Sequence, residues 1–523
     1  MSRIGIDVGG THTDAVLVDG ARVLGAVKTP TTTDVLSGVR AALAKLLAQT
    51  ACDPDGVAAV VIGTTHFTNA VIERRDLQRV GALRIGLPAS ASLPPFVDWP
   101  DDLSAMVRGQ TYMVAGGHEY DGRPIAPLDR GAIRDAARRM ADAGLTAVAV
   151  TSVFSPLTAA FEEEAEQILA EEMPGVSITL SHALGRIGLL ERENVALLNA
   201  CLQTLAHKTV AAFAEALCGS AITAPLYLTQ NDGTLMRAEM ASRFPVWCFA
   251  SGPTNSMRGA AFLSGLDDGV VVDVGGTTSD IGYLKGGFPR EANAAVEIGG
   301  VRTLFRMPDL LSIGLGGGTE ISGDGGRIGP RSVGFRLLEK ALVFGGDTLT
   351  ATDIACAAGR IDLGDRGRVS NLSPDLVAAT LARMGEMIAE GVDRMKSEAG
   401  DVTLLAVGGG GFLIPDRVEG CSAVIRVEHH AVANAVGAAI AQASGEVDQI
   451  FSNLTRDQAI AAARDEADAR AAAAGARPDS LKLVELEDIP LSYLPGDARR
   501  VRVRVVGDIG AQAGGEEFGD QRR

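Results

Sequence analysis

Buried strands that end in glycine turns dominate the pattern of hydrophobic and polar positions. Residues 4–14 and 271–280 follow one order: an apolar run, a carboxylate, two glycines, hydroxyl side chains and a second carboxylate. A β-branched apolar run is typical of a strand covered on both faces. The two glycines favour a tight turn, since glycine reaches positive φ without steric cost. Each copy therefore predicts a β-hairpin, with the return strand starting near Val16 or Ile281.

The two predicted hairpins carry groups suited to phosphate and Mg²⁺. Backbone N–H groups in such turns bind phosphate oxygens. Asp7 and Asp273 end the first strand of each copy. A carboxylate in that position can hold hydrated Mg²⁺, which binds one or two carboxylates together with phosphate. Two ordinary glycine hairpins would look the same, but a near-identical copy in each half of the chain favours a paired phosphate site.

Other segments predict an α/β protein with one less regular part. Strands near 146–152 and 176–180 alternate with helices over residues 128–180, which indicates a parallel sheet. Between residues 79 and 127 the pattern loosens and prolines cluster, as in an inserted segment. Residues 189–217 form one long helical pattern, and the charged residues 191–194 near its start predict a solvated face. Residues 481–506 hold two strand-like runs, and the tail after Gly507 has the composition of a disordered segment.

Three glycine-containing stretches are further candidates for ligand loops. Gly316–Gly318 predicts another turn, and Gly408–Gly411 follows a predicted parallel strand. Four glycines there let the backbone lie against a ligand, although close packing of a helix on the sheet would need them equally. Gly63-Thr64-Thr65 with His66 joins a strand to a helix, as a ligand loop or as a plain helix cap by Thr65. Residues 250–256 open a helix whose N-terminus we expect to face the second hairpin.

Length, charge and cysteines bound the class of protein. A chain of 523 residues is too long for one core, so two or more domains are expected. The net charge of −17 argues against a nucleic-acid groove or an anionic membrane surface. No apolar run reaches the ~20 residues of a membrane helix. Six scattered cysteines without a CxxC pair favour reduced thiols in a cytoplasmic protein, and no signal peptide is expected.

Several common catalytic motifs are missing from the sequence. It contains no GxxxxGK[ST], HExxH or GxSxG motif. His429 and His430 are adjacent rather than spaced for one helical face, so they make a poor metal pair. Spacing alone identifies no nucleophile–base pair and no general base.

Together the motifs resemble the actin-like ATPase and sugar-kinase superfamily, in which two similar domains close over ATP. The finer pattern resembles the A-subunit type of the hydantoinase/5-oxoprolinase family, to which acetone carboxylase subunits also belong. The matching segments are residues 9–14, 63–65, 68–70, 73–74, 251–253, 273–280, 313–318, 329–332, 349–350 and 408–411. His12 stands where the family usually has an aromatic residue, and Thr254-Asn255-Ser256 replaces a glycine-containing run. These departures bear on the substrate more than on the ATP site.

The resemblance implies an α/β fold with two actin-like ATPase domains of the ribonuclease H type and a nucleotide cleft between them. The expected domains are residues 1–250, with an inserted segment near 79–127, and residues 251–450. Residues 451–523 are expected to form a small C-terminal α/β extension with a disordered tail.

The implied function is ATP-dependent opening of a cyclic amide, such as a hydantoin, 5-oxoproline or a lactam, after phosphorylation of the amide oxygen. ATP and Mg²⁺ are the implied cofactors, and a large B-type subunit is the implied partner; self-association stays open. The catalytic candidates are Asp7, Thr11, Asp273 and Thr277, with Asp7 and Asp273 also as metal ligands. The nucleotide-binding candidates are Gly9, Gly10, Thr13, Gly275, Gly276, Thr278, Gly316, Gly317, Gly318, Gly408, Gly409, Gly410 and Gly411. Thr64, Thr65 and His66 are candidates for the substrate side. Two alternatives remain open, a small-molecule kinase and a nucleotide-switched scaffold without catalysis.

Overall fold

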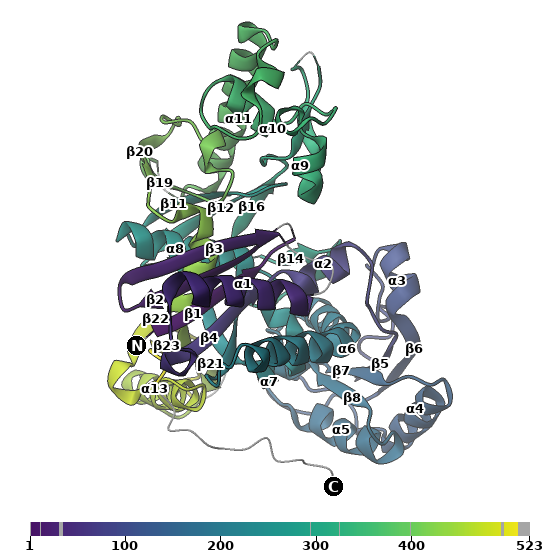
Figure 1. The fold of residues 1–523 in the computed structure, drawn as a ribbon. Coiled ribbons are helices and arrows are strands. Elements are labelled where there is room, and N and C mark those ends of the chain that lie inside the picture. Colours follow the sequence, from purple (N-terminus) through teal and green to yellow (C-terminus); the bar gives the residue numbers. More distant parts are fainter. Residues whose placement is uncertain are drawn as a thin grey trace.

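The protein is built from three main β-sheets with helices packed on them (Figure 1). The computed structural model describes residues 2–10, 12–30, 35–292, 294–323, 325–397, 399–492 and 496–510. Thr11 and most of the tail after Gly507 therefore lie outside the described residues.

The first sheet has nine strands and contains the N-terminal hairpin. Strand β1 pairs antiparallel with β2 and parallel with β4, and its apolar residues are buried. The strand order is β22-β23-β21-β10-β9-β4-β1-β2-β3. The bounds are β1 Ser2–Val8, β2 His12–Asp19, β3 Arg22–Pro30, β4 Val57–Thr64, β9 Leu226–Thr229, β10 Thr234–Arg237, β21 Gln442–Phe451, β22 Lys482–Pro490 and β23 Arg499–Gly507.

The second sheet repeats the arrangement around the second hairpin. Strand β11 pairs antiparallel with β12 and parallel with β19, and β19 pairs parallel with β20. The order β13-β12-β11-β19-β20 thus matches β3-β2-β1-β4-β9 of the first sheet. The bounds are β11 Gly269–Val274, β12 Ser279–Lys285, β13 Phe288–Pro289, β16 Leu310–Ile313, β19 Val402–Val407 and β20 Cys421–Arg426. The sequence duplication is therefore a duplication of topology.

The third sheet is fully parallel and occupies residues 80–180. Its order β6-β5-β7-β8 joins the predicted strands near 146–152 and 176–180 to two strands that the sequence pattern did not reveal. The bounds are β5 Val80–Leu87, β6 Arg108–Ala115, β7 Ala147–Ser152 and β8 Ser177–Leu180, with helices α3 Asp101–Val107, α4 Arg130–Asp142 and α5 Ala160–Glu172. The loosened pattern over 79–127 thus contains half of a regular sheet.

The long helix α6, Leu189–Gly219, packs against the third sheet. The predicted solvated face at its start is wrong, because Arg192 and Glu193 are 1% and 3% exposed. Arg84 on β5 forms an ion pair with Glu193 and is itself fully buried. A charge withdrawn from water needs such a partner, so this pairing explains why the charged segment faces inward.

Two short helices connect the first and second sheets. Helix α8, Ser251–Ser264, packs closely on α12, Ala433–Ile440. A Cβ atom added at Gly259 would lie 1.9 Å from the Ala433 carbonyl oxygen, and one at Gly437 would lie 1.9 Å from that of Asn255. The small residues of α8 and α12 are thus required by helix–helix contact.

The C-terminal segment extends the first sheet. Helix α13, Arg456–Ala473, packs on β21 and β23, and β22 with β23 account for the two strand-like runs. The remaining helices are α1 Val35–Thr50, α2 His66–Ile72, α7 Ala238–Arg243, α9 Leu337–Lys340, α10 Ala351–Ala357 and α11 Pro374–Met395. The exact domain boundaries stay a prediction. No helix within the described ranges combines the length and apolarity that a membrane crossing needs.

Candidate functional site

The first hairpin places two carboxylates opposite each other. Asp7 on β1 pairs in register with Asp14 on β2, and the Gly9 N–H donates to the His12 carbonyl at 3.0 Å. Both aspartates are buried, at 4% and 2% exposure. Lys28 on β3 neutralises Asp14, with its Nζ 2.7 Å from Oδ2. The sequence analysis missed Lys28, whose only signal is its cross-strand position opposite Asp14.

The second hairpin has the same geometry. Asp273 pairs in register with Asp280, and the Gly275 N–H donates to the Thr278 carbonyl at 2.9 Å. Thr277 and Thr278 are exposed at the turn. Positive φ does not explain the paired glycines, because Gly9, Gly10, Gly275 and Gly276 all lie outside the left-handed region. A Cβ at Gly9 would instead lie 3.1 Å from the His12 carbonyl oxygen, so crowding within the turn favours glycine. Close approach of a phosphate to Gly276 stays a prediction.

Two further glycine segments pack against the second hairpin. The N–H groups of Gly317 and Gly318 donate to the carbonyls of Gly275 and Gly276 at 3.0 and 2.7 Å. A Cβ at Gly316 would lie 2.6 Å from the Thr277 nitrogen. The backbone of residues 316–318 therefore stabilises the turn by hydrogen bonds. A role of these residues in nucleotide binding stays a prediction.

The 408–411 run lies on another side of the same turn. The Gly410 N–H donates to the Val274 carbonyl at 2.7 Å, and a Cβ at Gly408 would lie 2.2 Å from Asp273 Oδ1. Gly409 has open space where its Cβ would be. The run therefore combines close packing, at Gly408 and Gly410, with one position accessible to a ligand.

Asp7 lies in a polar environment assembled from distant segments. Asn434 on α12 donates its Nδ2 hydrogen to Asp7 Oδ2 at 2.8 Å. Oδ1 of Asp7 is buried and has no hydrogen-bond partner among the residues that the structure describes. Burial, followed by repulsion from Asp14, raises the pKa of Asp7 to about 7. A carboxylate oxygen left unpaired in a buried position fits a cation that is held there when nucleotide binds.

The carboxylates of the two hairpins lie within electrostatic range of each other. Asp273 contributes to the raised pKa of Asp7, and Asp14 and Lys28 act on the pKa of Asp273. Burial raises the pKa of Asp273, while a hydrogen bond from Ser256 on α8 lowers it. Burial also raises the pKa of Asp280 to about 6. Four carboxylates with Lys28 as the nearby cation form a negatively charged centre that suits a divalent ion and its phosphate ligands.

Residues near the N-terminus of α8 contact both the first sheet and the second hairpin. Ser251 Oγ donates to the Thr64 carbonyl at 3.0 Å and accepts from the Thr64 N–H at 3.3 Å. Asn255 donates to Thr229 Oγ1 at 2.9 Å, next to Gly63. The N-terminal turn of α8 therefore contacts the first sheet, while Ser256 reaches Asp273 of the second hairpin.

The substrate-side candidates are partly occupied by structural contacts. Thr64 is 1% exposed, and its Oγ1 accepts from the His66 N–H at 3.1 Å. Thr65 precedes α2 without a side-chain cap, so the helix-cap reading of Thr65 is wrong. Thr65 Oγ1 instead accepts from Asn69 Nδ2 at 3.3 Å. A substrate role for Thr64, Thr65 and His66 stays a prediction.

The site fits a hydrated ion better than a metal bound by protein alone. In the described part of the chain no group of three or more His, Cys, Asp and Glu side chains is arranged to hold a metal. Mg²⁺ usually keeps several waters and takes one or two carboxylates plus phosphate oxygens. Asp7 and Asp273 match that requirement.

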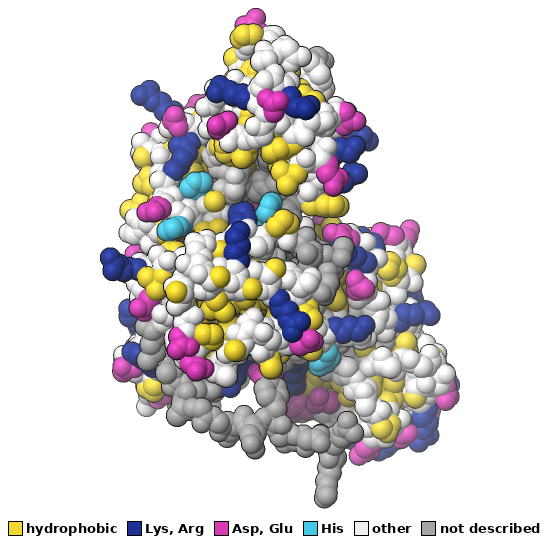
Figure 2. All heavy atoms as spheres, viewed as in Figure 1, with side chains coloured by type: hydrophobic (Ala, Val, Ile, Leu, Met, Phe, Trp, Pro, Cys, Tyr) yellow, Lys and Arg dark blue, Asp and Glu magenta, His cyan; other side chains and the backbone are white. Residues whose placement is uncertain are grey.

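On the face in Figure 2, described basic and acidic side chains are interspersed rather than gathered by sign.

The duplicated sheets, each with a glycine hairpin, define a mixed α/β protein of the actin-like fold class, as predicted. Residues 3–173 match the hydantoinase/oxoprolinase N-terminal region, and residues 192–366 match the hydantoinase/oxoprolinase domain. The chain belongs to the hydantoinase/oxoprolinase family, which confirms the resemblance.

Curated relatives and a solved structure agree with this family. The acetophenone carboxylase gamma subunit of Aromatoleum aromaticum is 27% identical over 69% of this chain and 54% of its own length. The caprolactamase subunit alpha of Pseudomonas jessenii is 26% identical over 68% of this chain and 54% of its own length. The chain thus spans little more than half the length of these two relatives. The crystal structure of ATP-dependent caprolactamase from Pseudomonas jessenii superposes with a TM-score of 0.78 at 19% identity, over 97% of this chain and 87% of that one.

Proposed function

We propose that this chain is the nucleotide-binding A-type component of an ATP-dependent hydrolase that opens a cyclic amide. The observation that carries the proposal is the pair of hairpins, each with a carboxylate at the same strand position, buried Asp7 and half-buried Asp273, and a glycine–threonine turn beside it. The similarity to a caprolactamase subunit supports the amide class of substrate. ATP, the metal and the substrate class all belong to this proposal.

An amide carbonyl carbon is a poor electrophile, and phosphorylation of the oxygen makes it reactive toward water. In phosphoryl transfer the protein mainly positions the groups and neutralises charge. Backbone N–H groups and the Thr277 and Thr278 hydroxyls at the second turn would bind phosphate oxygens. Asp7 and Asp273 would hold hydrated Mg²⁺, which supplies positive charge to the phosphates when it is bound. Asn434 keeps one oxygen of Asp7 oriented and leaves the other available.

We also propose that a second, large subunit completes the enzyme. The two curated relatives are named as the gamma and alpha subunits of their enzymes. The carboxylate cluster holds groups for phosphate and metal, and it contains no nucleophile–base pair for the activated carbon among its described side chains. The partner would bring further groups to the substrate.

The test measures ADP production by the purified full chain with a panel of hydantoin, 5-oxoproline, ε-caprolactam and other lactams. The proposal expects at least one cyclic amide to raise ADP production in wild type, and the nearly isosteric Asp273→Asn variant to lose the effect while keeping its fold. If no amide changes ADP production, with or without a co-purifying subunit, the proposal is wrong. Acetophenone or acetone with bicarbonate forms a separate arm, because one relative is a carboxylase subunit.

Two other functions would give different products in the same assay. A kinase would leave a stable phosphorylated small molecule, whereas the hydrolase releases phosphate together with ADP. A nucleotide-switched scaffold would turn ATP over slowly, without response to amides and with stimulation by a protein partner.

A further inference from the structure

A large cavity lies away from the two hairpins. Its volume is about 1400 Å³, and its wall comes from the third sheet, the β9–β10 turn and the C-terminal strands. Residues 155–159 and 182–187 line one side, and residues 230–232 and 444–446 line another. The volume exceeds that of a typical small-ligand pocket, so it has room for a substrate and water.

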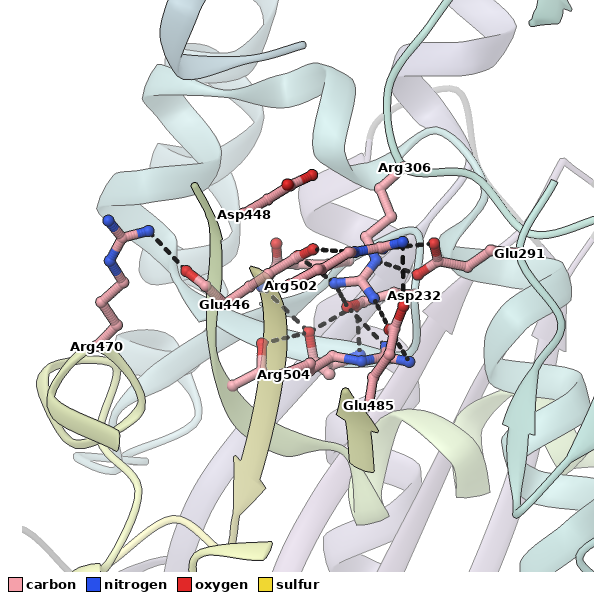
Figure 3. A network of polar contacts seen from close by, with 12 residues as sticks. Asp232, Glu291, Arg306, Glu446, Asp448, Arg470, Glu485, Arg502 and Arg504 are labelled. Carbon is pink, nitrogen blue, oxygen red and sulfur yellow. Dashed lines mark hydrogen bonds and ion pairs between the residues drawn. The ribbon is translucent and has the colours of Figure 1, made fainter. Parts of the chain in front are cut away.

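A network of ion pairs (Figure 3) borders the cavity at Asp232, Arg306 and Glu446. Arg306 is 17% exposed and pairs with Asp232, Glu291, Glu446 and Glu485. Arg502 and Arg504 pair with acids of the same set. Because these charged side chains pair with one another, the network holds together segments that are far apart in sequence. It is therefore a structural feature rather than a ligand site.

Another part of the cavity lining carries a histidine whose orientation is fixed. Glu162 on α5 is completely buried and accepts hydrogen bonds from the Ser152 N–H at 2.8 Å and the Ser181 hydroxyl at 2.6 Å. It also accepts from the His182 N–H at 3.0 Å, and it lies 2.8 Å from His182 Nδ1. Burial opposes ionisation, but the bonds from His182 and Ser181 prevail and lower the pKa of Glu162.

An ionised carboxylate only accepts hydrogen bonds, so Nδ1 of His182 carries the proton in this pair. Nε2 is then the ring nitrogen with a free lone pair. The His182 side chain is 22% exposed and lines the cavity. Arg192 donates to Ser181 Oγ at 3.0 Å and to the Ser152 carbonyl at 2.6 Å, which holds the segments around Glu162 in place. A base oriented by a buried carboxylate and facing a cavity is the arrangement of general-base catalysis.

One chain segment links the Asp7 environment to the cavity lining. A Cβ at Gly63 would lie 2.8 Å from Asp7 Oδ1 and 3.3 Å from Thr229 Oγ1, so Thr229 belongs to the Asp7 environment. Gln230, the next residue, already lines the cavity. Arg237, on β10 of the same wall, has no carboxylate partner among the described residues and offers positive charge to a phosphorylated ligand.

We propose that this cavity is a second small-molecule site, where His182, oriented by Glu162, is the general base for water attack on the activated cyclic amide. The proposal rests on the proposed function for the supply of an O-phosphorylated amide. Nε2 takes a proton from water as the water oxygen bonds to the amide carbon, and the C=N electron pair moves to the ring nitrogen. The proton on Nε2 then passes to that nitrogen.

The ring opens when the C–N bond breaks. Its electron pair leaves on nitrogen, which takes the hydroxyl proton of the tetrahedral intermediate, and an acyl phosphate remains. A second water hydrolyses the acyl phosphate. In sum, amide, ATP and two waters give an amino acid, ADP and phosphate.

The first test asks whether the cavity binds an amide without ATP. Diethyl pyrocarbonate acylates accessible neutral histidines of the full chain, and mass spectrometry locates the modified sites. We expect hydantoin, 5-oxoproline or ε-caprolactam at millimolar concentration to protect His182, while the exposed His207 stays reactive as the internal control. Protection of neither or of both histidines would overturn the second site.

The second test uses matched variants of the full chain with its co-purifying subunit. The His182→Asn variant can still donate to Glu162 but has no basic nitrogen, so amide-dependent turnover should fall about 10²-fold or more, with KM little changed. The Glu162→Gln variant tests positioning and should lower kcat rather than raise KM. Imidazole should restore part of the activity of the His182→Ala variant, and the His207→Asn variant should match wild type. Wild-type turnover in the His182→Asn variant would refute the general base.

The two proposals fail in different ways. Protection of His182 without any amide-stimulated ADP production would support the cavity and contradict the ATP-dependent function. Amide-stimulated ADP production that neither protects His182 nor depends on it would support the function and contradict the cavity.

Discussion

Replacement of Gly408 by alanine tests whether the glycine run after β19 supports Asp273. Gly408 has a φ of +87°, a conformation that costs a residue with a Cβ about 1–2 kcal/mol. The added Cβ would lie 2.2 Å from Asp273 Oδ1, 2.4 Å from the Val274 carbonyl oxygen and 2.8 Å from the Val274 nitrogen. Two of these are backbone atoms of a buried strand, so no side-chain rotation relieves the overlap.

The strain and the overlap together set the expected size of the effect. Overpacking typically costs about 1–3 kcal/mol, so Gly408→Ala should cost about 2–5 kcal/mol in total. Rotation of the Asp273 carboxylate relieves only its own contact, so the end of β11 must shift as well, and both changes displace the carboxylate. We therefore expect the affinity for Mg·ATP to fall more than about tenfold, which corresponds to about 1.4 kcal/mol.

The neighbouring glycine provides the control. Gly409 has no atom within 4 Å of its added Cβ, and its φ is not in the left-handed region. The Gly409→Ala variant should therefore keep the wild-type urea midpoint or raise it slightly. A chain of this length is not expected to unfold in two states, so midpoints of the circular-dichroism transition are compared, with calorimetry for Mg·ATP. A Gly408→Ala variant with the midpoint and affinity of wild type would refute the reasoning.

Four further outcomes are expected. The Asp273→Asn variant should keep its circular-dichroism spectrum and lose metal-dependent ATP turnover; full ATPase activity would contradict the assignment. Because the folded-state pKa of Asp7 is about 7, against an ordinary value of 3.8, the native state binds the extra proton between these values and stability should fall as pH rises from about 4 to about 7. The Asp7→Asn variant should show a shallower slope of urea midpoint against pH, and an unchanged slope would count against the burial argument. The Arg306→Ala variant removes a cation shared by four carboxylates, each of which still pairs with Arg502 or Arg504, and should lose about 1–3 kcal/mol of stability. The exposed Arg123→Ala variant should lose less than about 1 kcal/mol, and equal midpoints for both variants would show that the network is not structural. The chain expressed by itself should show little or no amide hydrolysis, and product formation at the rate of its ATP consumption would show that no partner is required.

The sequence determined the two hairpins and the position of their carboxylates. Strand period and turn chemistry are local, so a β-branched run, Asp7 or Asp273 and two glycines specify strand, carboxylate and turn within about ten residues. The near-identity of the two copies predicted two similar hairpins, and the family resemblance implied two similar domains, with which the matching strand orders agree. The same local signals predicted strands β7 and β8 and the extent of helix α6.

Only the tertiary structure decided what surrounds these local elements. Asn434 reaches Asp7 across 427 positions of sequence, and Gly317 supports a turn more than forty residues away. Arg192 and Glu193 look solvated in sequence, because a charge pattern does not reveal the ion pair that Arg84 supplies from another sheet. His182 likewise gains its orientation from Glu162, twenty residues earlier on a separate helix. Such contacts depend on how sheets and helices pack, and a one-dimensional pattern records the face of each element but not the partner that covers it.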